Sequence, residues 1–216
     1  MKTIKIIIAI ILSNLLSPVY GQEVEYDKLD SLTMKFVSEL QSENIDTICV
    51  YLDYSIGGIY LQDKNNPCTH RSNIFIPTYI LWISNGKTFL HKKDNCFDYK
   101  TIEIDAQSMW DIFLKHQLEI SKEKVKIFES KRTKRKSTIH ITSTPYIREF
   151  VVFIKGSEFV RMIFTDTDLE KETGVYQNIN YLHNQNLKGL ILVNKLEELI
   201  KGVEKDSLLI RDGWVR

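Results

Sequence analysis

The sequence predicts a single α+β domain, in which helices pack on a mostly antiparallel sheet built from two hairpins. Asn85-Gly86 separates two apolar runs, and Gly156-Ser157 separates two more. Both dipeptides favour two-residue hairpin turns because glycine adopts positive φ without strain. Apolar residues with helical spacing lie on either side of the first hairpin, in residues 23–42 and 105–121.

The first 21 residues have the pattern of a secretory signal peptide. Lys2 and Lys5 supply the positive start, Ile6–Leu16 the apolar core, and Val19-Tyr20-Gly21 the cleavage site. A membrane anchor is the alternative, but this apolar run is shorter than a bilayer span requires. We therefore expect residues 22–216 to be released into the periplasm or secreted, with no stable membrane span after cleavage.

Charge does not indicate a nucleic-acid partner. Without Lys2 and Lys5, the 29 basic residues become 27 against 28 acidic ones, a net charge of −1. A dedicated nucleic-acid binder carries a strong basic excess. The roughly 195 residues that remain suffice for one hydrophobic core.

The mature chain is expected to begin with a helix and a strand. Residues 23–42 place Leu29, Leu32, Phe36 and Leu40 on one helical stripe. Residues 45–62 then alternate between apolar and other side chains, which predicts a strand that turns or bulges at Gly57-Gly58. Residues 63–72 are polar and predict a loop.

The first hairpin has a defined register if Asn85 and Gly86 are its two turn residues. The expected pairs are Ser84 with Lys87, Ile83 with Thr88, Trp82 with Phe89, Leu81 with Leu90, and Ile80 with His91. Both faces are then apolar, which predicts strands covered on both sides. Pro77 falls opposite Asp94, where a missing N–H can end the ladder.

The next segments predict a strand at residues 99–104 and a helix to about Ser121, with Asp105 as its N-cap. The expected buried stripe of this helix is wide: Met109, Trp110, Ile112, Phe113, Leu114, His116, Leu118 and Ile120. The charged stretch 122–137 follows and could mark a subdomain break. One domain is preferred because each half alone has few core residues.

The second half predicts a strand at residues 139–142 and a hairpin at residues 150–164 around Gly156-Ser157. A type II′ turn there pairs Lys155 with Glu158, Ile154 with Phe159, Phe153 with Val160, and Val151 with Met162. The apolar residues of the stretch 166–188 have no clear helical or strand periodicity. We then expect a strand at residues 189–193, a helix opened by an Asn194/Glu197 capping box, and a strand at residues 208–210.

Three cysteines in an exported chain allow one disulfide. Cys68 and Cys96 lie in turn-like sequences that flank the first hairpin, whereas Cys49 lies in a strand-like run. We therefore expect a Cys68–Cys96 bridge and a buried Cys49 thiol, with three reduced thiols as the alternative. Such a bridge stabilises by roughly 3–4 kcal/mol in the loop-entropy model.

The bridge would bring two polar loops together and create a speculative ligand site. His70 could pair with Asp94, and Arg71 could bind a carboxylate or phosphate. Solvated loop residues are the alternative interpretation. His91 and His116 lie on apolar faces and are expected to be core histidines.

A basic cluster is the second speculative contact region, for polyanions such as envelope lipid or polysaccharide. It consists of Lys131, Arg132, Lys134, Arg135 and Lys136. A solvated loop is the alternative. The cluster has no interleaved aromatic residues, so stacking of single-stranded bases is not supported.

No motif predicts a metal or cofactor. Asp166, Asp168, Glu170 and Glu172 resemble a calcium loop, but Lys171 stands where the EF-hand pattern requires glycine. A solvated acidic turn or a helix first turn is the preferred interpretation. The five histidines are scattered, and the common nucleophile and nucleotide-binding motifs are missing.

The stretch YILWISNGKTFLHKKDNCFDYKTIEI, residues 79–104, resembles small uncharacterised exported proteins of Bacteroidota-type bacteria. The shared features are an apolar strand, N-G-K, an aromatic strand and D-N-C-F. The Ile/Asn/Lys-rich composition agrees with this resemblance, which covers about 30 residues and implies no activity or catalytic residue.

Two functions therefore compete, and whether the chain is an enzyme stays open. The leading hypothesis is a non-enzymatic periplasmic or secreted binding protein of unknown ligand or protein partner, envelope-associated or immunity-like. The alternative is a secreted hydrolase whose His, Asp and Arg residues assemble near the Cys68–Cys96 rim.

Overall fold

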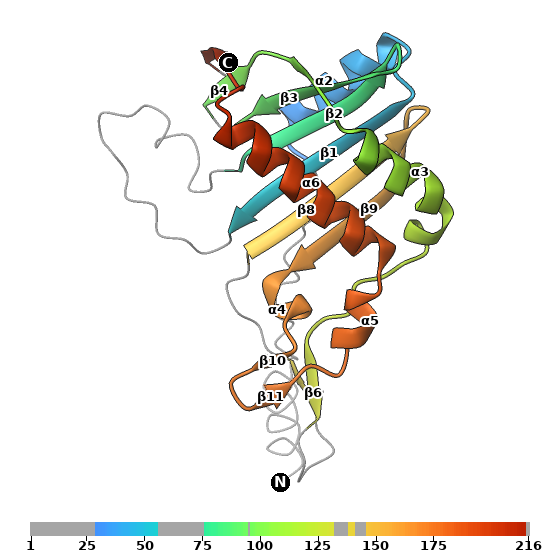
Figure 1. Cartoon of the computed structure of the whole chain (residues 1–216), viewed down its shortest axis with the longest axis vertical. Helices are drawn as coiled ribbons and strands as arrows, with labels where there is room; N and C mark the ends of the chain where they lie inside the picture. The colour runs from blue at the N-terminus through green and yellow to red at the C-terminus, as the bar shows by residue number, and fades with distance from the viewer. Residues whose placement is uncertain (1–28, 56–75, 95, 132–137, 141–145, 215–216) are drawn as a thin grey trace, which may run out of the picture. The chain divides into compact units, whose positions relative to one another are not determined.

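A central antiparallel sheet organises the computed structural model, which describes residues 29–55, 76–94, 96–131, 138–140 and 146–214 (Figure 1). Contacts divide the chain into two units, Met1–Met34 and Lys35–Arg216, and the second runs through the linker 122–137 without further division. The fold is α+β, as the sequence predicts.

Helix α2 (Ser31–Ser42) is the first described element. Asp30 Oδ1 accepts hydrogen bonds from the backbone N–H groups of Leu32 and Thr33, at 2.9 and 3.0 Å. These bonds satisfy donors that lack partners in the first helical turn, so Asp30 is the N-cap. The predicted start at residue 23, like the signal sequence, lies outside the described residues.

The sheet order is β12-β4-β3-β2-β1-β8-β9, and β5 also pairs with β3. Its strands are β1 (Thr47–Ser55), β2 (Thr78–Ser84), β3 (Lys87–Lys93), β4 (Phe97–Tyr99), β5 (Ile102–Ile104), β8 (Tyr146–Ile154), β9 (Ser157–Thr165) and β12 (Arg211–Trp214). β6 (Glu129–Lys131) and β7 (Thr138–His140) form a separate pair, as do β10 (Glu172–Thr173) and β11 (Tyr176–Gln177). Strand β1 pairs with both β2 and β8, so residues about 95 positions apart lie side by side.

The first hairpin has the predicted register. Trp82 pairs with Phe89, and the ladder ends at the pair Thr78–Lys93, beside Pro77. Asn85 and Gly86 both have positive φ, 51° and 74°, as a type I′ turn requires.

Two predictions for the segment after this hairpin are wrong in detail. The expected strand at residues 99–104 is two short strands, β4 and β5, which both pair with β3. Helix α3 (Gln107–Ile120) has Ala106 at its N-cap position, and Asp105, one residue earlier, accepts a hydrogen bond from Gln107 N at 3.2 Å. Leu114 and Leu118 are exposed, so the buried stripe of α3 is narrower than predicted.

The second hairpin turns one residue earlier than predicted. Lys155 and Gly156 have φ of 50° and 83°, and Ile154 pairs with Ser157. A bulge then inserts one residue into β9, so Val152 pairs with Val160. The predicted type II′ register is therefore wrong, although both strands exist.

Helix α6 (Lys188–Lys205) replaces the strand predicted at residues 189–193. Its apolar residues recur at helical spacing, and Leu192, Val193, Leu196 and Ile200 are buried. Asn194 lies inside the helix, so it forms no capping box. The Glu123 carboxylate accepts from Lys188 N and Gly189 N at 2.7 and 2.8 Å, and this long-range contact supplies the capping interaction. The last strand is β12 rather than residues 208–210.

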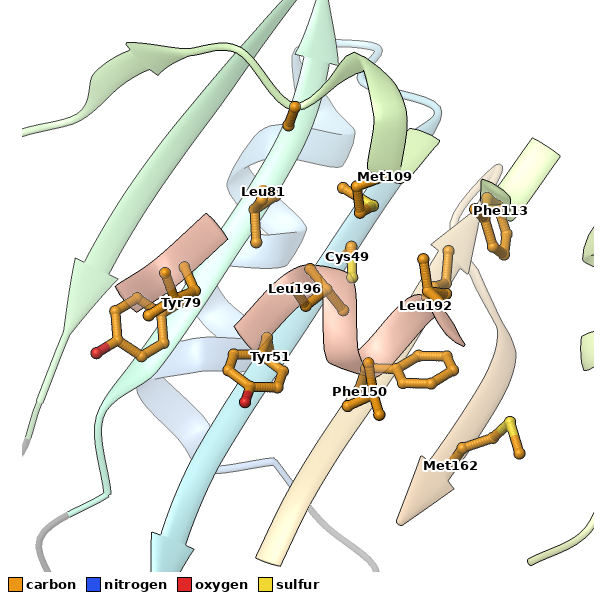
Figure 2. Packing of buried hydrophobic residues seen from close by; sticks show 14 of the residues in the cluster. Cys49, Tyr51, Tyr79, Leu81, Met109, Phe113, Phe150, Met162, Leu192 and Leu196 are labelled. Atoms are coloured by element: carbon orange, nitrogen blue, oxygen red, sulfur yellow. The ribbon is translucent and has the colours of Figure 1, made fainter. Parts of the chain in front are cut away.

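The main core lies between one face of the sheet and helices α3 and α6. Figure 2 shows Cys49, Leu81, Phe150, Leu192 and Leu196 packed together in this layer. On the opposite face, the Phe36 ring of α2 stacks on His91 at 4.3 Å. Both faces of the first hairpin are thus covered, as predicted.

Candidate functional site

Polar side chains interrupt the core where β1 ends and β8 begins, beneath the second half of α6. Tyr51 pairs with Phe150 along the strands, and Asp53 pairs with Arg148. Because side chains two residues apart share a face, Tyr51 and Asp53 both face the helix side. We call Tyr51, Asp53, Tyr146, Arg148 and Glu197 the Asp53 cluster.

Arg148 links the sheet to α6. Its guanidinium donates to Glu197 Oε2 at 2.8 Å and to Asn194 Oδ1 at 2.9 Å. Lys201 Nζ donates to the other Glu197 oxygen. Burial alone raises the pKa of Glu197, but the Lys201 hydrogen bond and the Arg148 charge outweigh it and lower the pKa below its usual value.

Asp53 has a different environment. Burial raises the pKa of its carboxyl group above the usual value, and the charge of Glu197 raises it further. A hydrogen bond with Tyr146 opposes this shift, as do the charges of Lys201 and Arg148. Among the residues that the structure describes, no cationic side chain forms an ion pair with Asp53.

The Tyr51 hydroxyl is the one enclosed side-chain polar atom of the described residues that has no hydrogen-bond partner. The side chain is fully buried. Burial raises the pKa of Tyr51, as do the nearby charges of Asp53 and Glu197. A buried hydroxyl without a partner costs about 1–3 kcal/mol, so this atom requires an explanation.

A second polar cluster lies beside the first, and we call Tyr79, Lys92, Tyr99 and Glu204 the Lys92 cluster. Lys92 Nζ binds Glu204 Oε1, and the Tyr79 hydroxyl donates to the same oxygen at 2.8 Å. The ammonium lies 4.8 Å from the ring centroid of Tyr99 and 5.4 Å from that of Tyr79. These distances allow cation–π attraction.

The rings of Tyr51 and Tyr79 connect the two clusters. Their centroids are 6.1 Å apart. Figure 2 shows both hydroxyls pointing away from Leu81 and Leu196, toward the same end of the sheet. The apolar core therefore ends in a polar layer that α6 covers from above.

Asp94 is the only residue of the predicted His70–Arg71–Asp94 site that the structure describes. Its Oδ1 accepts from Cys96 N and Phe97 N, both at 2.9 Å, and its Oδ2 accepts from the Tyr99 hydroxyl. The carboxylate thus shapes the turn between β3 and β4. His70 and Arg71 lie outside the described residues, so their pairing stays a prediction.

The other predicted contact residues are mostly outside the described residues. Lys131 ends β6, and Arg132, Lys134, Arg135 and Lys136 lie beyond the described part. Cys96 is buried, and Cys68 also lies outside. The predicted bridge therefore stays a prediction, although Cys49 is a free thiol and is not its partner.

The potentially reactive side chains among the described residues, Cys49, His91 and His116, contact other parts of the fold. Cys49 is fully buried, and burial raises its pKa to about 12, so thiolate formation at neutral pH is strongly disfavoured. His91 is buried against Phe36, as predicted. His116 is only partly buried and lies 3.0 Å from Glu119, so its predicted core role is wrong.

The acidic stretch 166–172 is used within the fold. Asp168 accepts from Phe128 N and from the Thr165 hydroxyl, and Glu170 accepts from Thr173. Asp166–Leu169 forms the short helix α4, with acidic residues in its first turn as the sequence indicates. Over the described residues, no group of three His, Cys, Asp or Glu side chains could hold a metal ion.

Sequence reasoning missed the Asp53 cluster. One signal was present, because Asp53 interrupts an apolar strand at a position that shares a face with Tyr51. The partner signal was the spacing of Glu197 and Lys201, four residues apart on a helix. What the sequence could not supply was the pairing of β1 with β8.

Comparison of the chain with protein-family models, with curated proteins and with solved structures gave no match. Within the described ranges, no helix has both the length and the apolar character that a membrane span needs.

Proposed function

We propose that this protein is an exported, non-enzymatic binding protein whose ligand or partner belongs to the cell envelope or its surroundings. The observation that carries the proposal is the unpartnered Tyr51 hydroxyl, next to a half-buried Asp53 carboxylate that forms no ion pair with any described residue. Both groups have hydrogen-bonding capacity that the described residues leave unused. Such convergent, unsatisfied polar groups are typical of ligand sites.

The reactive side chains support binding rather than catalysis. Cys49 is buried as a thiol, and His183 Nε2 lies 2.9 Å from the backbone oxygen of Lys124. Asp94 accepts three hydrogen bonds from its own turn. These groups therefore serve the fold, whereas a hydrolase requires a base that is free to reach a substrate.

A ligand screen tests the proposal. The mature chain would be heated with primary amines, carboxylates and neutral saccharides in turn, and the melting temperature recorded. At least one class should raise the melting temperature, because a ligand that binds only the folded state stabilises it. The ligand should be recovered unchanged after long incubation. A melting temperature that no class raises would refute the proposal, and conversion of the ligand would favour the hydrolase.

Export and the disulfide are parts of the same proposal. The charged start, apolar core and cleavage sequence of residues 1–21 support export. Mass spectrometry of the mature protein should find Gln22, or its pyroglutamate form, as the first residue, and a protein that retains Met1 would contradict cleavage of the signal sequence.

A Cys68–Cys96 bridge is the expected oxidised form of the exported chain. Non-reducing peptide mass spectrometry should find the two cysteines linked and Cys49 free. Reduction should lower the free energy of unfolding by roughly 3–4 kcal/mol. Detection of Cys68 as a free thiol in the oxidised protein would end this part of the proposal.

A further inference from the structure

The two clusters under α6 contain the same kinds of groups, with one difference. The Lys92 cluster consists of one carboxylate, two tyrosines and one primary ammonium, which binds Glu204 and lies over both rings. The Asp53 carboxylate also has two tyrosines beside it, Tyr51 and Tyr146. It has no ammonium. The Lys92 cluster thus shows that a primary ammonium fits between a carboxylate and two tyrosines in this protein.

The cations near Asp53 are already engaged. Arg148 donates to Glu197 and Asn194, and Lys201 donates to the same Glu197. Glu197 therefore takes both positive charges, and the donor on Asp53 is the neutral Tyr146 hydroxyl. The unmet requirement of this site is a positively charged hydrogen-bond donor.

A positively charged hydrogen-bond donor would also suit the Tyr51 hydroxyl. Asp53 and Glu197 place negative charge near it, and Arg148 is the opposing charge. An oxygen in such surroundings is favoured as an acceptor from a cationic N–H group. Asp53 and Tyr146 are half-buried, whereas the Tyr51 hydroxyl is enclosed, so these two residues are the part of the site that is open to solvent.

From this geometry we propose that Tyr51, Asp53 and Tyr146 bind the protonated primary amine of a small organic ligand. The inference rests on the proposed binding function and names the ligand class. An anionic ligand is disfavoured because it would meet two carboxylates while both nearby cations are engaged. A divalent metal ion is disfavoured because the described residues offer no third acidic, histidine or cysteine ligand there.

The test uses ligands that differ in one functional group. Butylamine, 1,4-diaminobutane, butan-1-ol and butanoate would be titrated into the mature, oxidised protein at neutral pH, with affinity measured by NMR chemical-shift perturbation. The amines should bind about tenfold or more tightly than the alcohol, because only they bring a positive charge to the hydrogen bond with the Asp53 carboxylate. Butanoate should bind most weakly.

Variants assign the binding to this site. Asp53→Asn keeps an acceptor for Tyr146 but removes the charge, and should weaken amine binding about tenfold. Tyr51→Phe should weaken it less, because the acceptor that is lost is an uncharged hydroxyl rather than a carboxylate. Tyr54→Phe is the matched control, since Tyr54 lies on the opposite face and its hydroxyl is 3.4 Å from Glu149. Far-UV circular dichroism checks that each variant is folded.

The outcomes distinguish the amine assignment from the more general binding function. Equal affinity for amine and alcohol, or unchanged amine binding in Asp53→Asn, would overturn the amine assignment. If a saccharide or carboxylate raises the melting temperature and no amine binds, the assignment fails while the binding function stands. If no probe of any class binds, both fail, and an enclosed water is then the partner of the Tyr51 hydroxyl.

Discussion

The Lys92 cluster and the Asp53 cluster lie under the same helix, but among the described residues only the carboxylate of the first, Glu204, has an ammonium bound directly to it. In the Lys92 cluster, the chain supplies an ammonium that is only 10% exposed and binds Glu204. In the Asp53 cluster, Glu197 takes the available cations and leaves Asp53 with a hydroxyl donor. The difference teaches that two similar tyrosine–carboxylate arrangements can differ in whether a cationic side chain is bound directly to the carboxylate.

The largest effect on the free energy of unfolding should come from the Arg148–Glu197 ion pair, which lies beside Asp53. Arg148→Met should lower the free energy of unfolding by about 3 kcal/mol, because it leaves Glu197 without its best-buried partner. Urea denaturation measures this change. Lys201→Met is the matched control: this exposed lysine contacts the same carboxylate, and its loss should be almost neutral. Equal losses would contradict the assignment of Arg148 as the principal partner.

Loss of the built-in ammonium should have the next largest effect. Lys92→Met should cost about 2 kcal/mol, since it removes a hydrogen bond to a charged group and the cation–π contacts with Tyr79 and Tyr99. Lys87→Met is the control, because Lys87 also pairs with a glutamate, Glu103, but both are exposed. If the two variants melt alike, the Lys92 cluster does not contribute as a unit.

The two tyrosines should respond in opposite directions to loss of the hydroxyl. Tyr79→Phe removes a hydrogen bond to Glu204 and should destabilise by about 1 kcal/mol. Tyr51→Phe removes an unpartnered buried hydroxyl and should be neutral or stabilise by up to about 1 kcal/mol. Denaturation in ligand-free buffer measures both. Destabilisation by Tyr51→Phe would show that its hydroxyl has a partner.

The pH dependence of stability should separate Asp53 from Glu197. Burial raises the pKa of Asp53 above the ordinary 3.8, so the folded chain binds more protons and stability falls as pH rises from 3.8 through the folded-state pKa. Asp53→Asn lacks this loss, so its free energy of unfolding should rise relative to that of the wild type over that pH range.

The contribution of Glu197 to stability depends on pH in the opposite direction, so a Glu197 variant is the control for that measurement. Its pKa is lowered, so its contribution is present above 4.5 and is lost as pH falls through the folded-state value. Glu197→Gln should therefore differ most from the wild type at neutral pH and least in acid. Parallel pH profiles for the two variants would contradict the assigned environments.

Local turn chemistry explains what the sequence could and could not predict about the hairpins. Asn85 and Gly86 both tolerate positive φ, so one turn is favoured and the whole register follows. In the second hairpin, Gly156 could stand first or second in the turn. The structure places it second, with Lys155 at φ 50°, and a bulge then shifts the register.

Long-range contacts explain the other errors. Residues 189–193 form a continuous apolar run that suits a buried strand or a buried helix, and Glu123, 65 residues earlier, caps the helix. The Asp53 cluster likewise depends on the pairing of β1 with β8. Asp53 was visible as a charge within an apolar strand, but nothing in its neighbouring sequence identifies Arg148 or Glu197 as its surroundings.

Helix α6 carries one carboxylate of each cluster, Glu197 and Glu204. Seven residues correspond to about two helical turns, or roughly 10.5 Å along the axis. The helix therefore fixes the separation of the two carboxylates along its axis. A shift of α6 along that axis would displace Glu197 and Glu204 by the same amount, so the Arg148 and Lys92 ion pairs would be strained together.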